Sequence, residues 1–148
     1  MTEIVRVAPP LLRQIAELEA LTFAHPWSEQ ALELLCDESR AFGFAALCEG
    51  RAVAYGGMLT VLDEGQITNI ATHPDHRRRG LAGQVLEALL TEARARGLAF
   101  VTLEVRESNA AAIALYEKYG FATVGRRPRF YTQPTEAALI LRCDPVDA

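Results

Sequence analysis

The sequence predicts an α/β protein with a mixed β-sheet, and two observations carry that prediction. Strand-like runs at 41–48 and 51–62 are separated only by Glu49-Gly50, a spacing typical of an antiparallel hairpin. Strand-like runs at 66–72 and 100–105 each lead instead into a helical pattern, as β-α units do. Hairpins followed by β-α connections combine antiparallel and parallel pairing in one sheet. A chain of 148 residues fits one domain, so we assign residues 1–148 to it.

Three elements are expected before the hairpin. Residues 4–7 alternate weakly and predict a first strand, and Pro9-Pro10 stands where prolines commonly begin a helix. The apolar stripe of that helix comprises Leu11, Ile15, Leu18 and Thr22. A second helix is expected to begin at Ser28, a favourable N-cap, with Trp27 and Leu32 at the positions of a hydrophobic staple.

The later elements follow from turn residues and periodicity. A turn at 63–65 is expected to lead into the strand 66–72. A helix opens at Gly80, carries an apolar face to about Arg96, and is ended by Gly97. The other expected elements are a strand at 100–105, a helix at 110–119, strands at 121–124 and 137–141, and an arginine-rich loop at 125–135 that joins the last two strands.

The composition limits the function classes. The net charge of −4 argues against general nucleic-acid binding, so a cluster of arginines suits a small anion better than a polyanion. No run reaches signal-peptide or membrane-spanning length. The three cysteines are odd in number and widely spaced, which indicates reduced thiols. We therefore expect a cytoplasmic protein with neither a nucleic-acid nor a membrane partner.

Acidic residues gather in and after the two N-terminal helices. They are Glu17, Glu19, Glu29, Glu33, Asp37 and Glu38. This acidic region would attract a basic protein tail, but the simpler interpretation is a solvated helical face.

The most informative stretch is the turn Arg77-Arg78-Arg79-Gly80-Leu81-Ala82-Gly83, between a strand and a helix. Glycines at such a turn let backbone N–H groups approach an anion, and the helix N-terminus adds a positive dipole. Arginines beside those amides supply charge and forked donors. The turn matches neither the nucleoside-triphosphate loop nor the dinucleotide fingerprint. We interpret it as a pyrophosphate cradle, the alternative being an ordinary helix start with solvated arginines.

A second set of polar residues follows the strand 100–105. Ligands of open α/β sheets bind at the carboxyl ends of strands, where Glu104 interrupts an apolar run. Glu104 is either a functional carboxylate or a strand-end charge facing water. Asn109 is most simply an N-cap, a role compatible with ligand contact. Tyr116, two turns into the helix, is more often a core residue at such a position.

Other kinds of site are not favoured. His73 and His76 have a spacing that metal ligands use, but they flank a proline turn beside arginines, so no metal is expected. No histidine or other base lies near any cysteine in sequence, so a cysteine nucleophile is not expected either.

Taken together, four stretches resemble the GNAT N-acetyltransferase superfamily. Arg77-x-x-Gly80-x-Ala82 is similar to its acyl-CoA pyrophosphate motif. The runs 70–82 and 103–116, with Gly120-Phe121 and the N-terminal 25–29, resemble GNAT enzymes of the RimI type, which acetylate the N-terminal alanine of ribosomal protein S18. The resemblance covers nearly the whole chain. It implies the GNAT (acyl-CoA N-acyltransferase) fold, with a mixed central sheet of about seven strands and about four helices.

The resemblance also implies a V-shaped split between the strands ending at Ala71 and Glu104, in which acetyl-CoA lies. It assigns the proton acceptor to Glu104 and the proton donor to Tyr116. It assigns cofactor binding to Ile70, Ala71, Thr72, Arg78, Arg79, Gly80, Leu81, Ala82, Gly83 and Asn109, and it implies no metal. The implied activity is direct acetyl transfer from acetyl-CoA to a protein N-terminal amine, with ribosomal protein S18 as the expected partner.

The acceptor is less well defined than the donor. The family often has a Tyr-Tyr pair where this chain has Phe130-Tyr131, and its usual Glu-Asp-Ala-Leu before the last strand is missing. The segment 126–131 borders the acceptor groove or is mere surface. The alternatives are a GNAT enzyme for another amine (a small amine, polyamine or lysine) and a non-catalytic acyl-CoA-binding module.

Overall fold

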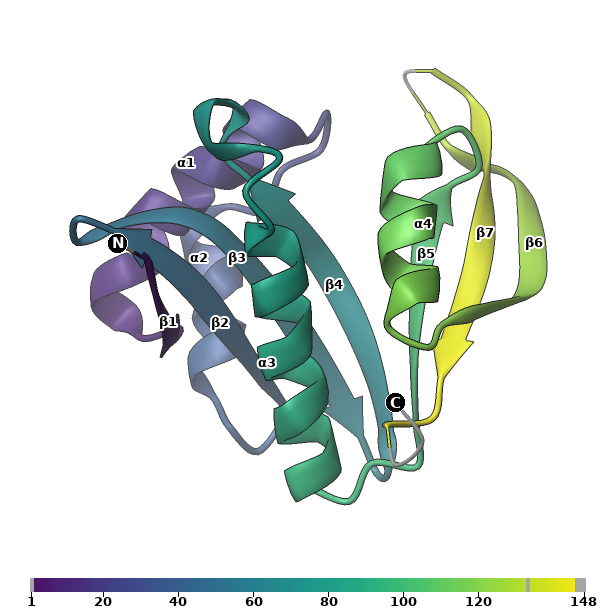
Figure 1. The fold of residues 1–148 in the computed structure, drawn as a ribbon, viewed down its shortest axis with the longest axis horizontal. Coiled ribbons are helices and arrows are strands. Elements are labelled where there is room, and N and C mark those ends of the chain that lie inside the picture. Colours follow the sequence, from purple (N-terminus) through teal and green to yellow (C-terminus); the bar gives the residue numbers. More distant parts are fainter. Residues whose placement is uncertain (1, 133, 146–148) are drawn as a thin grey trace.

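The computed structural model describes residues 2–132 and 134–145 as a single seven-stranded sheet covered by helices (Figure 1). The strands are β1 Thr2–Arg6, β2 Ala41–Cys48, β3 Arg51–Val61, β4 Glu64–Thr72, β5 Phe100–Arg106, β6 Ala122–Tyr131 and β7 Glu136–Cys143. The α-helices are α1 Leu12–Thr22, α2 Glu29–Leu32, α3 Leu81–Ala95 and α4 Ala110–Lys118. The predicted mixed α/β sheet of seven strands with four α-helices is confirmed.

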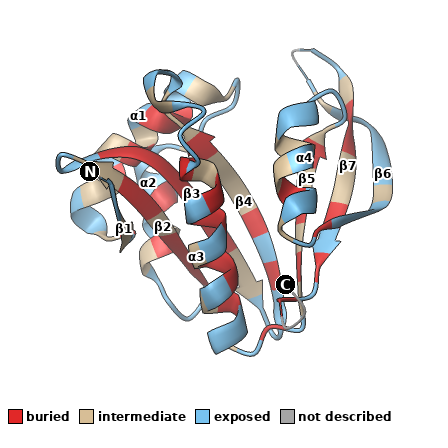
Figure 2. Ribbon diagram, viewed as in Figure 1, coloured by how far each residue is buried: buried red, intermediate tan, exposed pale blue. Residues whose placement is uncertain are grey.

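Alternation along β2 and β3 builds two separate cores, one on each face of the sheet. Ala45 and Tyr55 pack with α1 and α2, whereas Phe42 and Met58 pack with α3. Strands buried on both faces consist of near-continuous apolar residues, and Figure 2 shows β2 and β3 as largely buried. The two cores hold the first half of the sheet rigidly between helices.

The sheet is split between β4 and β5. These two strands pair in parallel only at their starts, where Glu64, Gly65 and Gln66 oppose Phe100, Val101 and Thr102. Beyond those residues the strands diverge, and the two halves of the sheet form a V in Figure 1. β4 stays paired to β3, and β5 to β7. The main-chain groups on the inner edges of the V are therefore available to a ligand, and the split expected between Ala71 and Glu104 is confirmed.

A β-bulge interrupts the pairing of β4 with β3. Gly56 opposes Ile70 and Met58 opposes Ile67, so Gly57 alone faces the two residues Thr68 and Asn69. A bulge bends its strand and re-aims the side chains next to it. This bulge lies just before the carboxyl end of β4, at the mouth of the split.

The predicted arginine-rich loop at 125–135 is wrong, because most of it belongs to β6. β6 is the outermost strand and pairs only with β7. An edge strand with little buried surface shows no apolar alternation, and charges such as Arg126 and Arg127 protect it from further pairing. Pro128 is tolerated there because the register shifts between Arg127 and Tyr131.

Two smaller differences concern boundaries. The turn expected at 63–65 is a two-residue connection at Leu62-Asp63, with Leu62 at a φ of 55°. The helix begun by Ser28 has one α-helical turn and continues as a 3₁₀ helix over Glu33–Cys36. The Ser28 cap itself is confirmed, since its side chain accepts the Ala31 N–H. Within 2–132 and 134–145, no helix is long and apolar enough to cross a membrane.

Candidate active site

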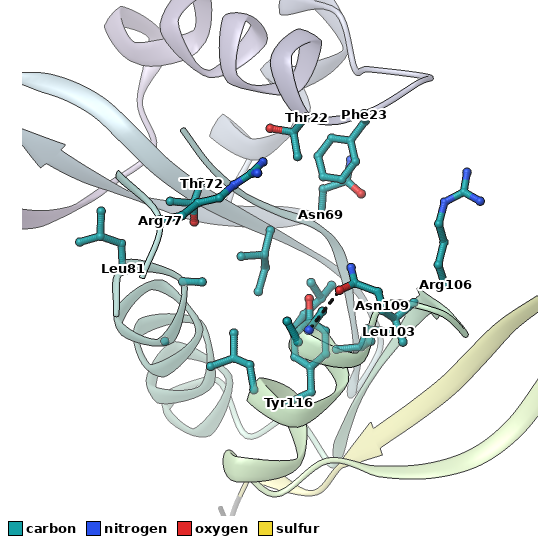
Figure 3. Close-up of a pocket in the computed structure, with 18 of the residues that line it drawn as sticks. Thr22, Phe23, Asn69, Thr72, Arg77, Leu81, Leu103, Arg106, Asn109 and Tyr116 are labelled. Carbon is teal, nitrogen blue, oxygen red and sulfur yellow. Dashed lines mark hydrogen bonds between the residues drawn. The ribbon is translucent and has the colours of Figure 1, made fainter. Parts of the chain in front are cut away.

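A pocket of about 720 Å³ opens in the split between β4 and β5. Its walls come from the α1 end, β4, the turn before α3, β5, α4 and the end of β6. In Figure 3, Arg77 and Leu81 lie on one side of this pocket, with Asn109 and Tyr116 on the other. The two strand ends singled out from the sequence thus converge on one space.

The N-terminus of α3 forms the anion-binding part of the pocket. Gly80 is the N-cap, with a φ of 75° and no side-chain capping bond, and a Cβ there would still have open space around it. The first amides of a helix have no intrahelical partner, so those of α3 are free to bind an anion. Arg77 and Arg78 stand beside them in the pocket wall. These residues fit a bound pyrophosphate.

Most of the predicted cofactor residues meet in this pocket. Those in its wall are Ile70, Thr72, Arg78, Gly80, Leu81, Ala82, Gly83 and Asn109. Ala71 and Arg79 are not in the wall. The Ala71 side chain points the other way and is buried against the α1 core, because successive strand residues face opposite sides. Arg79 is exposed.

Asn109 can cap α4 and contact a ligand at the same time. Its Oδ1 accepts the Ala112 N–H at 3.2 Å and so caps α4. The same carboxamide lies in the pocket wall, where its nitrogen remains a donor.

Glu104 lies on β5 and is half-buried in the wall of the pocket. Its backbone pairs with Ile140 of β7, which holds the strand in place. Among the described residues, no hydrogen bond or ion pair engages its carboxylate, whereas most other buried or half-buried carboxylates here are paired. The Glu104 oxygens are thus able to accept a proton from a molecule in the pocket.

Tyr116 enters the same pocket from α4. It is 8% exposed, and its ring packs edge-on against Phe121 with centroids 5.7 Å apart. Burial, with a smaller contribution from Tyr131, raises the pKa of Tyr116 to about 12. A phenol with that pKa is fully protonated at neutral pH and is suited to donate a proton.

Tyr131 and Arg106 form a wall that the sequence only hinted at. Tyr131 ends β6, and the Arg106 guanidinium lies over its ring, 4.5 Å from the centroid. Arg106 also donates to the backbone oxygens of Thr132 and Pro134, fixing the β6–β7 connection. Burial, followed by the Glu104 carboxylate, raises the pKa of Tyr131. Of the segment 126–131, Tyr131 therefore borders the pocket, while Phe130 is 45% exposed.

Sequence reasoning missed the wall opposite β5 that Thr22, Phe23 and Asn69 provide. It also placed Glu19 in an acidic, solvated region, which is wrong, since Glu19 is 0% exposed. The other five acidic residues of that region are exposed, as expected. One signal was present: Glu19 lies four residues after Ile15 and so falls on the apolar stripe of α1.

Two other kinds of chemistry find no support in the described chain. Among the described residues, no group of three potential metal ligands occurs. The rings of His73 and His76 pack edge to face against each other. None of the three cysteines forms a disulfide within the described chain, and none lies in the pocket wall.

Known proteins resemble this chain in both sequence and structure. A family model described as the acetyltransferase (GNAT) family matches residues 12–121. The ribosomal protein bS18-alanine N-acetyltransferase of Escherichia coli K12 is 41% identical over 126 residues, covering 84% of each chain. A crystal structure of the Escherichia coli ribosomal-protein-S18-alanine N-acetyltransferase gives a TM-score of 0.85 at 37% identity, covering 97% of this chain and 94% of that one. Arabidopsis thaliana NAA60, in complex with a bisubstrate analogue, shares the fold with a TM-score of 0.88 at 15% identity, covering 97% and 98%.

Proposed function

This chain belongs to the GNAT acetyltransferase family, and from that premise we propose that it acetylates the N-terminal α-amine of a protein, using acetyl-CoA as donor. The observation that carries the proposal is the meeting of Glu104 and Tyr116 in one pocket with the open N-terminus of α3. A free carboxylate, a protonated phenol and an anion site are what acetyl transfer from a phosphate-bearing thioester to an amine requires.

We assign the start of α3 and the end of β4 to the donor. Acetyl-CoA, when bound, supplies an acetyl group activated as a thioester. The amides at the start of α3, together with Arg77 and Arg78, bind phosphate, and the main chain of Ile70 to Thr72 offers hydrogen bonds to the rest of the donor. Strand-end amides also stabilise negative charge on the reacting carbonyl oxygen. Asn109 contributes its free amide nitrogen.

In the acceptor half of the pocket, the side chains of Glu104 and Tyr116 transfer protons. An α-amine has a pKa of about 8, so at neutral pH much of it is protonated and unable to attack. Glu104 takes that proton, directly or through a water molecule. Tyr116 donates a proton to the departing sulfur. The nitrogen loses two protons in all, one from the ammonium form and one as the amide forms. One of them replaces the proton that Tyr116 gives to sulfur, and the other passes through Glu104 to the solvent, so the net products are an amide, a thiol and one released proton.

The proposed acceptor is the N-terminal alanine of ribosomal protein S18, which is the substrate named for the two Escherichia coli relatives. At 41% identity over 84% of the chain, the relationship extends well beyond the donor-binding turn. Such a substrate is a component of the translation machinery, and we infer a cytoplasmic location from it.

The proposal is tested with acetyl-CoA and a peptide copying the N-terminus of bS18, with product identified by mass spectrometry. Wild type is expected to acetylate the free α-amine and to leave a peptide with a blocked N-terminus and an internal lysine unmodified. Glu104→Gln is expected to lower kcat/KM about 100-fold at pH 7, with the deficit shrinking as pH rises past the pKa of the amine. Turnover of lysine or a polyamine in preference to the α-amine would contradict the acceptor, and unchanged rates for Glu104→Gln would contradict its role.

A further inference from the structure

Glu19 is a buried carboxylate that the proposed chemistry does not use. It lies on α1 with 0% exposure, between the helix and strands β3 and β4. It accepts the Trp27 N–H at 2.9 Å, the Tyr55 hydroxyl, and the Asn69 Nδ2, at 2.9 and 3.2 Å to its two oxygens. A buried charge persists only when it is fully hydrogen-bonded, and these three donors supply its bonds.

The contact with Asn69 fixes which way that carboxamide faces. The Asn69 nitrogen donates to both oxygens of Glu19, at 3.2 and 2.9 Å, so the oxygen of the same carboxamide is turned the other way. The Asn69 oxygen then faces away from α1. No described residue donates to that oxygen, and Asn69 lies in the wall of the pocket, above Tyr116 in Figure 3.

The backbone contributes to this orientation. Asn69 is one of the two β4 residues that oppose Gly57 at the β-bulge. The bulge allows its side chain both to reach Glu19 beneath the sheet and to border the pocket. An unpaired carbonyl oxygen at this place accepts hydrogen bonds from N–H groups in the pocket.

We propose that Glu19 is a positioning residue that holds Asn69 so that Asn69 Oδ1 accepts a hydrogen bond from an N–H of the acceptor's N-terminal residue. The inference rests on the proposed function and names the part of the site that binds the acceptor. The same carboxylate anchors the Trp27 amide, and with it the segment after α1 that presents Phe23 to the pocket. Acceptor binding is thereby tied to the interior of the first half of the sheet.

Three single variants and one double variant test this, with steady-state kinetics on the bS18 peptide and acetyl-CoA. Asn69→Ala removes the accepting oxygen and is expected to raise the peptide KM about 5- to 10-fold, with kcat and the acetyl-CoA KM changed less than about twofold. In Glu19→Gln, the new carboxamide can donate as well as accept hydrogen bonds, so the Asn69 side chain can rotate and exchange the places of its oxygen and nitrogen. This variant is expected to raise the peptide KM to a similar extent. The double variant is expected to match Asn69→Ala, since Glu19 acts on the acceptor through Asn69.

Tyr55→Phe is the comparison variant. It removes one donor to Glu19, and the contact of the Tyr55 hydroxyl with Asn69, but leaves both Glu19–Asn69 hydrogen bonds in place, and Tyr55 does not line the pocket. It is expected to lower Tm by about 2–6 °C and to leave the peptide KM within about twofold of wild type. The inference would be overturned if Asn69→Ala left the peptide KM unchanged, or if Tyr55→Phe raised it as much as Asn69→Ala does. In either case turnover of the peptide by wild type would still uphold the proposed function. Absence of peptide turnover by wild type would instead remove the proposed function.

Discussion

Tyr116 shows how the position of one residue in the fold sets its chemistry. It is enclosed by α4, Phe121 and the pocket wall, and this enclosure raises its pKa to about 12. The phenol is therefore kept in its neutral form, with a proton to give, over the whole physiological range. Glu104, in contrast, is half-buried on β5 and has no hydrogen bond or ion pair to its carboxylate within the described chain.

This difference predicts how the enzyme responds to Tyr116→Phe. Loss of the proposed general acid is expected to lower kcat about 100-fold at pH 7, while the affinity for acetyl-CoA is retained. Because the pKa of Tyr116 is raised to about 12, the wild-type rate is expected to show no alkaline decline from its ionisation below about pH 11. Tyr119→Phe is the control, because Tyr119 is the C-cap of α4 and is partly buried but lies outside the pocket wall. Its rate is expected to stay within roughly threefold of wild type. Stopped-flow detection of released thiol measures both, and equal losses in the two variants would contradict the assignment.

At the same scale, sequence reasoning selected residues that line the pocket where a residue departed from its local pattern. Glu104 stands out in an apolar strand, and Arg78 to Gly83 form a recognisable turn, so both sets were identified. Glu19 and Asn69 were not identified, because their importance depends on a contact across 50 residues. Tyr116 was ambiguous by periodicity, and it is indeed both packed and in the pocket.

Among the elements, the turn before α3 combines strain with charge. Arg78 has a φ of 65°, in the left-handed region that costs a non-glycine residue about 1–2 kcal/mol. Such strain persists when the surrounding structure imposes it, and it is concentrated at functional sites. Here it brings the Arg78 side chain into the pocket wall, next to Arg77 and the free amides of α3. Arg79, one residue later, is exposed and outside the wall.

Replacing Arg78 by glycine is expected to stabilise the fold and to weaken acetyl-CoA binding. The free energy of unfolding should rise by about 1 kcal/mol, since glycine adopts this backbone conformation without strain. The dissociation constant for acetyl-CoA should rise roughly tenfold, since a charged donor to phosphate is lost. Urea unfolding and isothermal calorimetry measure the two quantities. Arg79→Ala is the comparison, with a smaller expected loss of affinity, and a larger loss there would show that Arg79 is the phosphate ligand.

Element by element, the sequence predicted helices better than edge strands. Caps at Ser28 and Asn109 and the glycine at 80 marked helix starts correctly. The start of β6 was predicted, at 121–124, but its extension to Tyr131 was missed, because an exposed edge strand lacks the alternation that a buried face imposes. The bulge in β4 was also not predicted, because it depends on how β3 pairs with it.

For the molecule as a whole, the two halves of the sheet are joined through few main-chain contacts. β4 and β5 share only three paired positions, and the pocket lies where the pairing stops. The family resemblance correctly implied this V and its seven strands. It defined the acceptor less well than the donor, because the pocket wall that we assign to the acceptor is assembled from α1, β4 and β6, which are far apart in sequence.

A donor that contacts both halves is expected to stabilise the native state. At 100 times its dissociation constant, CoA should add about 2.7 kcal/mol to the free energy of unfolding and raise Tm by about 5–10 °C. Differential scanning fluorimetry across a CoA titration measures this. The Arg78→Gly variant should need more CoA to reach the same shift. A Tm independent of CoA concentration would mean that the donor does not bind the native fold.

The divergence of β4 from β5 leaves main-chain amides and carbonyls for the donor, beside the side chains proposed for its phosphates. A substitution exchanges a side chain and leaves the main-chain groups in place, so that part of the donor site is insulated from most mutations. The opposite wall depends on individual side chains such as Asn69 and Tyr131, each of which one substitution can alter. An enzyme built in this way can evolve toward new amines while keeping the same acetyl donor. The same backbone framework persists in a plant protein with only 15% identity.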